Sequence, residues 1–207
     1  MRDQRPYNVA YYAAHRDEEL ARVQRRQRDA VSFLRDLRRV PCADCGNSFA
    51  PYVMEFDHKE PGTKSFWILQ RAGSVSRDRL LTELSKCEVV CANCHRARTY
   101  ARAIERREAR SRGGHEPRRE SRRRREQTAL IQTLRVCACM DCGRQFPFYV
   151  MDFDHRVPGE KAFEITRMLG RTSTQNLLDE IAKCDIVCAN CHRERTFRRR
   201  SKNAGVA

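Results

Sequence analysis

The chain has 207 residues, of which 42 are Lys or Arg and 27 are Asp or Glu, so its formal net charge is +15. A basic excess of this size is typical of proteins that bind polyanions, most often nucleic acid. No apolar run is long enough to cross a membrane, and the first residues lack the apolar core of a signal peptide. The sequence therefore predicts a cytoplasmic protein with no membrane partner.

Cysteine content points to metal binding. Eleven cysteines occur in the chain, and the cytoplasm keeps thiols reduced, so metal sites are favoured over disulfide bonds. Only 40% of the residues are hydrophobic, which is little for one large core. Two small domains, each held together by a metal ion, are therefore expected.

Periodicity and stop signals predict the elements of the first half. Residues 8–39 carry apolar side chains at three- and four-residue spacing and should form a helix that Pro41 ends. Residues 52–58 alternate in character like a strand. Ser76 should cap a helix that reaches Leu84, and a further helix is expected from about residue 93 to about 110.

Glycines and a proline interrupt the chain within residues 111–117, where we place the domain boundary. The predicted domains are residues 1–112 and 113–207. The second one opens with a basic helix over about 118–135, in which Ile131 falls at the position of Leu34 in the first half.

The two halves are a tandem duplication. A shift of 97 residues aligns 42–99 with 139–196 without a gap, and 32 of these 58 positions are identical. Repeats at a fixed period are units of structure, so each half should form the same module.

Each repeat carries two Cys-x2-Cys pairs, which is the spacing of a tetrahedral structural zinc site. The first pair of each repeat is followed by a glycine that allows a tight turn. Cys87, Cys184 and Cys137 are left over, and the first two should be small buried residues. The predicted ligands are Cys42, Cys45, Cys91 and Cys94 in the first repeat, and Cys139, Cys142, Cys188 and Cys191 in the second.

An Asp-His pair lies between the cysteine pairs. Asp57 offers the carboxylate oxygen that a hard cation such as Mg²⁺ prefers. His95 directly follows a zinc ligand, so its ring should be fixed in place as a second ligand. His58 could take a proton from water near neutral pH. The duplication repeats these residues as Asp154, His155 and His192.

The pattern Cys-x2-Cys, Asp-His, Cys-x2-Cys-His resembles the HNH, or ββα-metal, nucleases over residues 41–100 and 138–197. The resemblance implies an α+β fold of two small zinc-stapled ββα modules, each preceded by a long basic helix. It also implies that Asp and the last His bind a divalent cation and that the first His is the general base. Asn93 and Asn190 are candidates for the group that orients this base, although their position also suits a helix cap. Glu55 and Asp152 lie on the same strand face as this Asp and should either support the metal ligands by hydrogen bonds, which we favour, or act as a ligand themselves.

The resemblance implies a metal-dependent endonuclease that hydrolyses DNA, with His-activated water as the nucleophile and two modules in one chain. The expected cofactors are two structural zinc ions and catalytic Mg²⁺ or Mn²⁺. Double-stranded DNA is the expected partner, and the chain could act as a monomeric pseudo-dimer. Two alternatives stay open: a non-catalytic zinc-knuckle protein that binds nucleic acid, or a nuclease with one active module. The residues expected to bind phosphate are Lys64, Arg96, Lys161 and Arg193.

Overall fold

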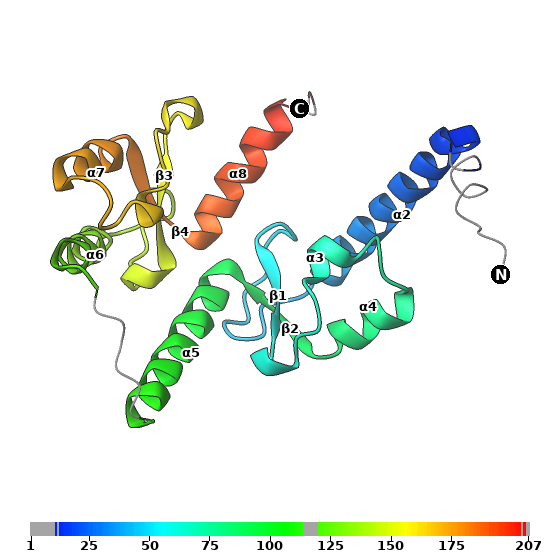
Figure 1. Cartoon of the computed structure of the whole chain (residues 1–207), viewed down its shortest axis with the longest axis horizontal. Coiled ribbons are helices and arrows are strands. Elements are labelled where there is room, and N and C mark those ends of the chain that lie inside the picture. The colour runs from blue at the N-terminus through cyan, green and yellow to red at the C-terminus, as the bar shows by residue number, and fades with distance from the viewer. Residues whose placement is uncertain (1–10, 12, 114–119, 204, 206–207) are drawn as a thin grey trace, which may run out of the picture. The chain divides into compact units, whose positions relative to one another are not determined.

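The computed structural model describes residues 11, 13–113, 120–203 and 205. Predictions that concern residues 8–10 and 114–119 lie outside these ranges. The chain divides into two compact units, Met1–Val90 and Cys91–Ala207. Both repeats mix helices with a two-stranded sheet (Figure 1), which confirms the predicted α+β class.

The first repeat contains one long helix, two short helices, a 3-10 turn and a two-stranded sheet. The helix predicted over residues 8–39 is interrupted at His15, the N-cap of its long part, and it ends at Leu37; the described residues 11, 13 and 14 before His15 are helical as well. Ser76 caps a later helix as predicted, since its side chain accepts a hydrogen bond from the backbone N–H of Arg79. In chain order the elements are α2 (Arg16–Leu37), β1 (Met54–His58), η1 (Pro61–Thr63), α3 (Ile68–Arg71), α4 (Arg77–Leu84) and β2 (Cys87–Cys91).

The second repeat follows a similar order, with the 3-10 helix η4 where the first repeat has α3, and the long helix α5 at the end of the first repeat precedes it. Strands β3 and β4 pair antiparallel, with Met151 opposite Cys188 and His155 opposite Cys184. In Figure 1, β4 runs directly into helix α8, so the last residue of the strand is followed at once by the first turn of the helix. The elements are α5 (Ala92–Arg112), α6 (Arg122–Leu134), η2 (Phe148–Val150), β3 (Met151–His155), η3 (Pro158–Glu160), η4 (Ile165–Arg167), α7 (Thr174–Ile181), β4 (Cys184–Cys188) and α8 (Ala189–Asn203).

The same four positions build the core of both repeats. Every member of the first set is related to its counterpart by the shift of 97 residues, although two of the four pairs differ in residue type. Burial of these side chains is the main source of stability for modules of this size. The first set is Leu34, Ile68, Ala72 and Leu80. The second set is Ile131, Ile165, Leu169 and Leu177.

Helix α5 belongs to the compact unit of the second repeat. It contacts α8 and η2, so the units divide before α5, whereas the sequence places a domain boundary after it. The reason is visible in the side chains: Tyr100 of α5 stacks on Tyr149, with ring centroids 4.1 Å apart, and meets the edge of Phe148. Such aromatic pairs stabilise packing beyond the area that they bury.

Candidate functional site

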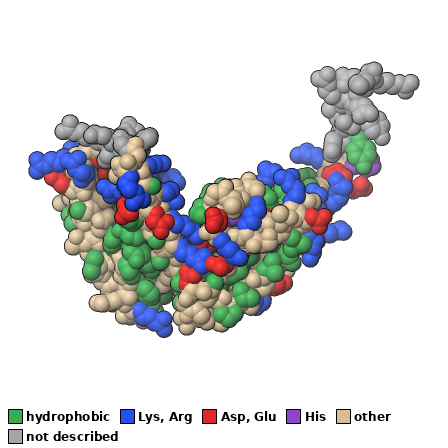
Figure 2. All heavy atoms as spheres, turned by 90° about the horizontal axis from the view of Figure 1, so that it is seen from below, with side chains coloured by type: hydrophobic (Ala, Val, Ile, Leu, Met, Phe, Trp, Pro, Cys, Tyr) green, Lys and Arg blue, Asp and Glu red, His purple; other side chains and the backbone are tan. Residues whose placement is uncertain are grey.

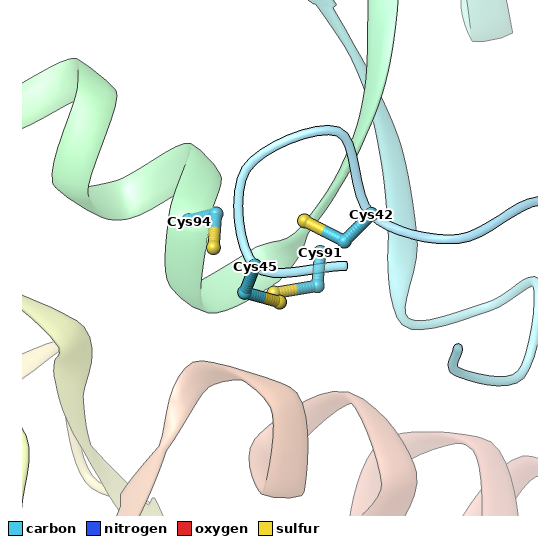
Figure 3. Close-up of side chains that lie close together, drawn as sticks. All are labelled: Cys42, Cys45, Cys91 and Cys94. Atoms are coloured by element: carbon cyan, nitrogen blue, oxygen red, sulfur yellow. The ribbon is translucent and has the colours of Figure 1, made fainter. Parts of the chain in front are cut away.

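Four cysteines converge in each repeat, as predicted, and we call each set a four-cysteine group. The sulfur atoms of each group all lie within 4.8 Å of one another. A tetrahedral zinc site with bonds of about 2.3 Å places its sulfurs about 3.8 Å apart, so each group could hold a zinc ion. Figure 3 shows the first group, in which Cys42 and Cys45 come from a loop and Cys91 and Cys94 from the end of β2 and the start of α5.

The loop of each group is a tight turn that depends on glycine. Gly46 and Gly143 have φ angles of 69° and 68°, a backbone conformation that residues with a Cβ seldom adopt. The backbone N–H of Gly46 donates to the carbonyl of Cys42 over 2.9 Å. The turn therefore brings the two sulfurs of the first Cys-x2-Cys to the same side.

The second group favours a thiolate at Cys139. Burial works against ionisation of this thiol, but backbone N–H groups directed at the sulfur, including that of Cys188 at 3.2 Å, lower its pKa to about 7. A thiolate is the form that binds zinc. Cys137 does not belong to the group within the described residues, and it packs against the neighbouring core instead.

Cys184 is buried, as the sequence predicts for both leftover cysteines at this position, whereas Cys87 is only partly buried. Each thiol donates to the backbone carbonyl of a glutamate four residues earlier, at 3.5 Å. Burial raises the pKa of both thiols to about 11, so neither is a thiolate at neutral pH.

Asp154 and His192 come together in the second repeat. Asp154 is 4% exposed near the end of β3, and its Oδ1 lies 3.5 Å from His192 Nε2 on the first turn of α8. The other ring nitrogen of His192 lies 3.0 Å from Asp152 Oδ2. Asp152 thus helps to orient the His192 ring.

Asp154 is also held by two arginines of α8 that were not predicted from the sequence. Arg199 reaches both carboxylate oxygens at 2.8 Å, and Arg195 reaches Oδ2 at 3.1 Å. Burial would raise the pKa of Asp154, but these guanidinium groups hold it below its usual value. A cation that binds this carboxylate therefore competes with Arg195 and Arg199.

His155 is held by a buried glutamate. Its Nε2 lies 2.8 Å from Glu180 Oε1, and the two side chains are 10% and 2% exposed. Although burial opposes ionisation, hydrogen bonds from Lys183, His155 and two backbone N–H groups lower the pKa of Glu180 to about 2. An ionised carboxylate can only accept, so Nε2 carries a proton and Nδ1 is the nitrogen that can take one up.

The first repeat has the same pair. His58 Nε2 lies 2.8 Å from Glu83 Oε1, and hydrogen bonds from Lys86 and the backbone of Ser65 hold the pKa of Glu83 low despite its burial. Neither glutamate was predicted from the sequence. Their signal was available, since Glu83 and Glu180 are one of the identical pairs of the duplication, but they lie on helices 25 residues from the histidines.

Asn93 and Asn190 are engaged elsewhere. The side-chain oxygen of each accepts a hydrogen bond from the backbone N–H of the other, at 2.9 Å in both directions. They thus join the first turns of α5 and α8, and glutamates rather than these asparagines bind the imidazole nitrogens of His58 and His155. Both asparagines therefore bind backbone groups at helix N-termini, which is close to the helix-capping role that the sequence gave as their alternative.

The residues expected to bind phosphate differ in their surroundings. Lys161 pairs with Glu164. Its counterpart Lys64 instead lies over the ring of Trp67, 2.9 Å from the ring centroid. Arg96 pairs with Asp152 at 2.9 Å, so this residue of the first repeat contacts a strand of the second repeat.

A pocket of about 540 Å³ opens over this site in the second unit. It contains the Asp-His pair, His192 and several cationic side chains, and its basic lining suits an anionic ligand. Arg96 lines it, whereas its repeat counterpart Arg193 does not. The lining includes Arg96, Arg135, Asp154, His155, His192 and Arg199.

The surface around the helices is strongly basic. On the face that Figure 2 shows, Lys and Arg side chains are spread widely, with acidic side chains between them. On α5, Arg106, Arg107 and Arg110 are exposed. Among the helices of the described residues, none has both the length and the apolar character needed to cross a bilayer.

Comparisons of the chain with protein-family models, with curated proteins and with solved structures gave no match. The interpretation of the site therefore depends on its own geometry and chemistry.

Proposed function

We propose that this chain is a metal-dependent endonuclease of the HNH type, with two modules that hydrolyse phosphodiester bonds of DNA. One observation carries the proposal. The carboxylate of Asp154 and the imidazole of His192 lie 3.5 Å apart, next to a histidine whose ring is held by a buried carboxylate. A cation ligand pair beside an oriented base is the arrangement that metal-assisted hydrolysis requires.

The residues present fit a hard divalent cation such as Mg²⁺ or Mn²⁺. Such an ion takes one or two protein ligands and completes its shell with water and phosphate oxygens. Asp154 and His192 would hold it, and it would supply positive charge for the oxygen that leaves phosphorus.

The protein groups have separate tasks in this proposal. His155 accepts a proton at Nδ1 from the attacking water, while Glu180 keeps the ring in position and stabilises the imidazolium. Arg199 and Lys161 line the same pocket and neutralise charge on the phosphate. The proton then passes from His155 to solvent or to the leaving oxygen.

One observation favours a second candidate, a zinc-knuckle protein that binds nucleic acid without cutting it. Arg195 and Arg199 already satisfy Asp154 with three hydrogen bonds. A carboxylate with this charge compensation needs no cation for stability. The four-cysteine groups and the basic surface would serve either function.

Plasmid cleavage separates the two candidates. Supercoiled DNA is incubated with Mg²⁺ or Mn²⁺ and the wild-type chain, His58→Ala, His155→Ala or the double variant. We expect linear product from the wild type, nicked circles from each single variant and no cleavage from the double variant. His15→Ala is the matched control, because His15 precedes α2 and pairs with Glu18 on the surface.

Two results would contradict the proposal. Cleavage that survives in the double variant would exclude His58 and His155 as the bases. Salt-sensitive DNA binding without cleavage, with either cation, would establish the non-catalytic candidate.

A further inference from the structure

The pocket of the second repeat contains a residue of the first repeat. Arg96 follows the last cysteine of the first four-cysteine group by two residues, yet its guanidinium lies 2.9 Å from Asp152 Oδ2 and lines the pocket with His155 and His192. Its side chain is 48% exposed, so it remains accessible to a ligand.

Three contacts keep Arg96 in this place. The reciprocal hydrogen bonds of Asn93 and Asn190 join α5 to α8 three residues before Arg96. The ring of Tyr100, four residues after it, stacks on Tyr149. Because Arg96 lies between the Asn93 and Tyr100 contacts on the same helix, these contacts fix its position relative to the pocket.

A second arginine in the pocket is incompletely satisfied. Among the described residues, Arg135 Nε is buried without a hydrogen-bond partner, and its guanidinium lies 4.7 Å from the ring centroid of Phe153. Its counterpart in the first repeat, Arg38, donates from Nε to the carbonyl of Leu34 at 3.1 Å. A buried donor without a partner costs free energy unless a ligand or water satisfies it.

The two arginines of the pocket, Arg96 and Arg135, also share one carboxylate, that of Asp152. Arg96 and Arg135 both act on Asp152 and repel each other, and burial together with Arg96 lowers the pKa of Arg135. Asp152 already binds His192. An anion between the two guanidinium groups would satisfy the open donor and relieve the repulsion.

We propose that Arg96 and Arg135 form a phosphate-binding subsite in the pocket of the second repeat, so that helix α5 of the first repeat completes the site of the second. The ligand is a phosphate group of the nucleic acid chain. This inference rests on the proposed function and extends it, since it makes the second site dependent on a residue outside its own repeat.

Cleavage by the second site alone tests the subsite. In the full-length His58→Ala chain, we expect Arg96→Ala to lower kcat/KM roughly tenfold or more, because a phosphate contact is lost, and Arg96→Lys to restore part of it. Arg79→Ala removes the same charge from an exposed position on α4 and should change kcat/KM by less than about twofold.

A second readout does not depend on cleavage. The chain has six histidines, so their ring C–H signals can be followed by NMR while inorganic phosphate is added without divalent cations. We expect phosphate to shift the His155 and His192 signals in the wild type and in Arg79→Ala, but not in Arg96→Ala.

The outcomes distinguish this inference from the proposed function. A phosphate response that needs Arg96, in a chain that cuts no DNA, would refute the nuclease and support the subsite. An unchanged phosphate response in Arg96→Ala would overturn the subsite. The subsite would also be overturned if Arg96→Ala lowered cleavage by the first site, measured in the His155→Ala chain, and left cleavage by the second site unchanged.

Discussion

Two buried glutamates hold the rings of His58 and His155. Glu83 and Glu180 are 1% and 2% exposed, and each binds Nε2 of the histidine in its own repeat at 2.8 Å. Two backbone N–H groups and a lysine bind the same carboxylate in each case. A buried carboxylate with this many donors stays ionised and fixes both the ring and its tautomer.

The substitution Glu180→Gln tests this positioning role. Glutamine has the same shape, but its amide cannot receive all of these hydrogen bonds as an anion does. In the His58→Ala chain we expect kcat to fall roughly tenfold to a hundredfold with little change in KM, because a misplaced base slows chemistry and not binding. The measurement is steady-state cleavage of a labelled duplex.

Glu126→Gln is the control for that change, because Glu126 is exposed on α6 and pairs with Arg122. Zinc content and the unfolding temperature of both variants show whether the fold is intact. A Glu180→Gln chain that keeps the parent kcat would refute the positioning role.

At the scale of elements, helix α5 contributes residues to both a four-cysteine group and the pocket. It starts at the first four-cysteine group and packs on α8 and η2 of the second unit. The helix therefore carries both Cys94 of the first four-cysteine group and Arg96 of the pocket in the second repeat. Helices of this composition are stabilised mainly by the contacts that they make and less by their own propensity.

Loss of the Tyr100 stack should loosen this connection. We expect Tyr100→Ala to lower the free energy of unfolding of the second unit by about 1 kcal/mol or more, the typical contribution of an aromatic pair. Cleavage by the second site should fall in the same variant, because Arg96 lies one turn earlier on α5. Chemical denaturation and cleavage in the His58→Ala chain measure the two effects.

Ile104→Ala provides the comparison on the same helix, since Ile104 is 38% exposed. It should change both quantities little. Equal effects of the two substitutions would show that the Tyr100 contacts do not anchor the helix.

At the scale of the whole molecule, the described residues form small clusters of buried apolar side chains beside two four-cysteine groups. One cluster in each repeat is built around four buried positions common to both, and a further cluster of the second repeat includes Cys139 and Cys188. Modules with so little apolar burial usually depend on a metal or disulfides for stability. The structure offers one four-cysteine group for each repeat.

Zinc stoichiometry tests this arrangement. We expect two zinc ions for each wild-type chain, one for Cys139→Ser, and a lower unfolding temperature after chelation. Cys137→Ser is a matched control two residues away, because Cys137 is outside the four-cysteine group among the described residues, and it should keep both ions. Elemental analysis of the purified chains measures the metal, and two ions in Cys139→Ser would contradict the assignment.

Local spacing in the sequence was sufficient to predict the repeat, the α+β class, the four-cysteine groups and the capped helix at Ser76, because each depends on residues close in the chain or on identity between the halves. Other contacts depend on how helices pack on strands. These are the hydrogen bond between His155 and Glu180, the hydrogen bonds from Arg195 and Arg199 to Asp154, and the contact of Arg96 with Asp152. Only the tertiary structure decides these contacts, since side chains distant in sequence meet according to packing and burial and not according to any local pattern.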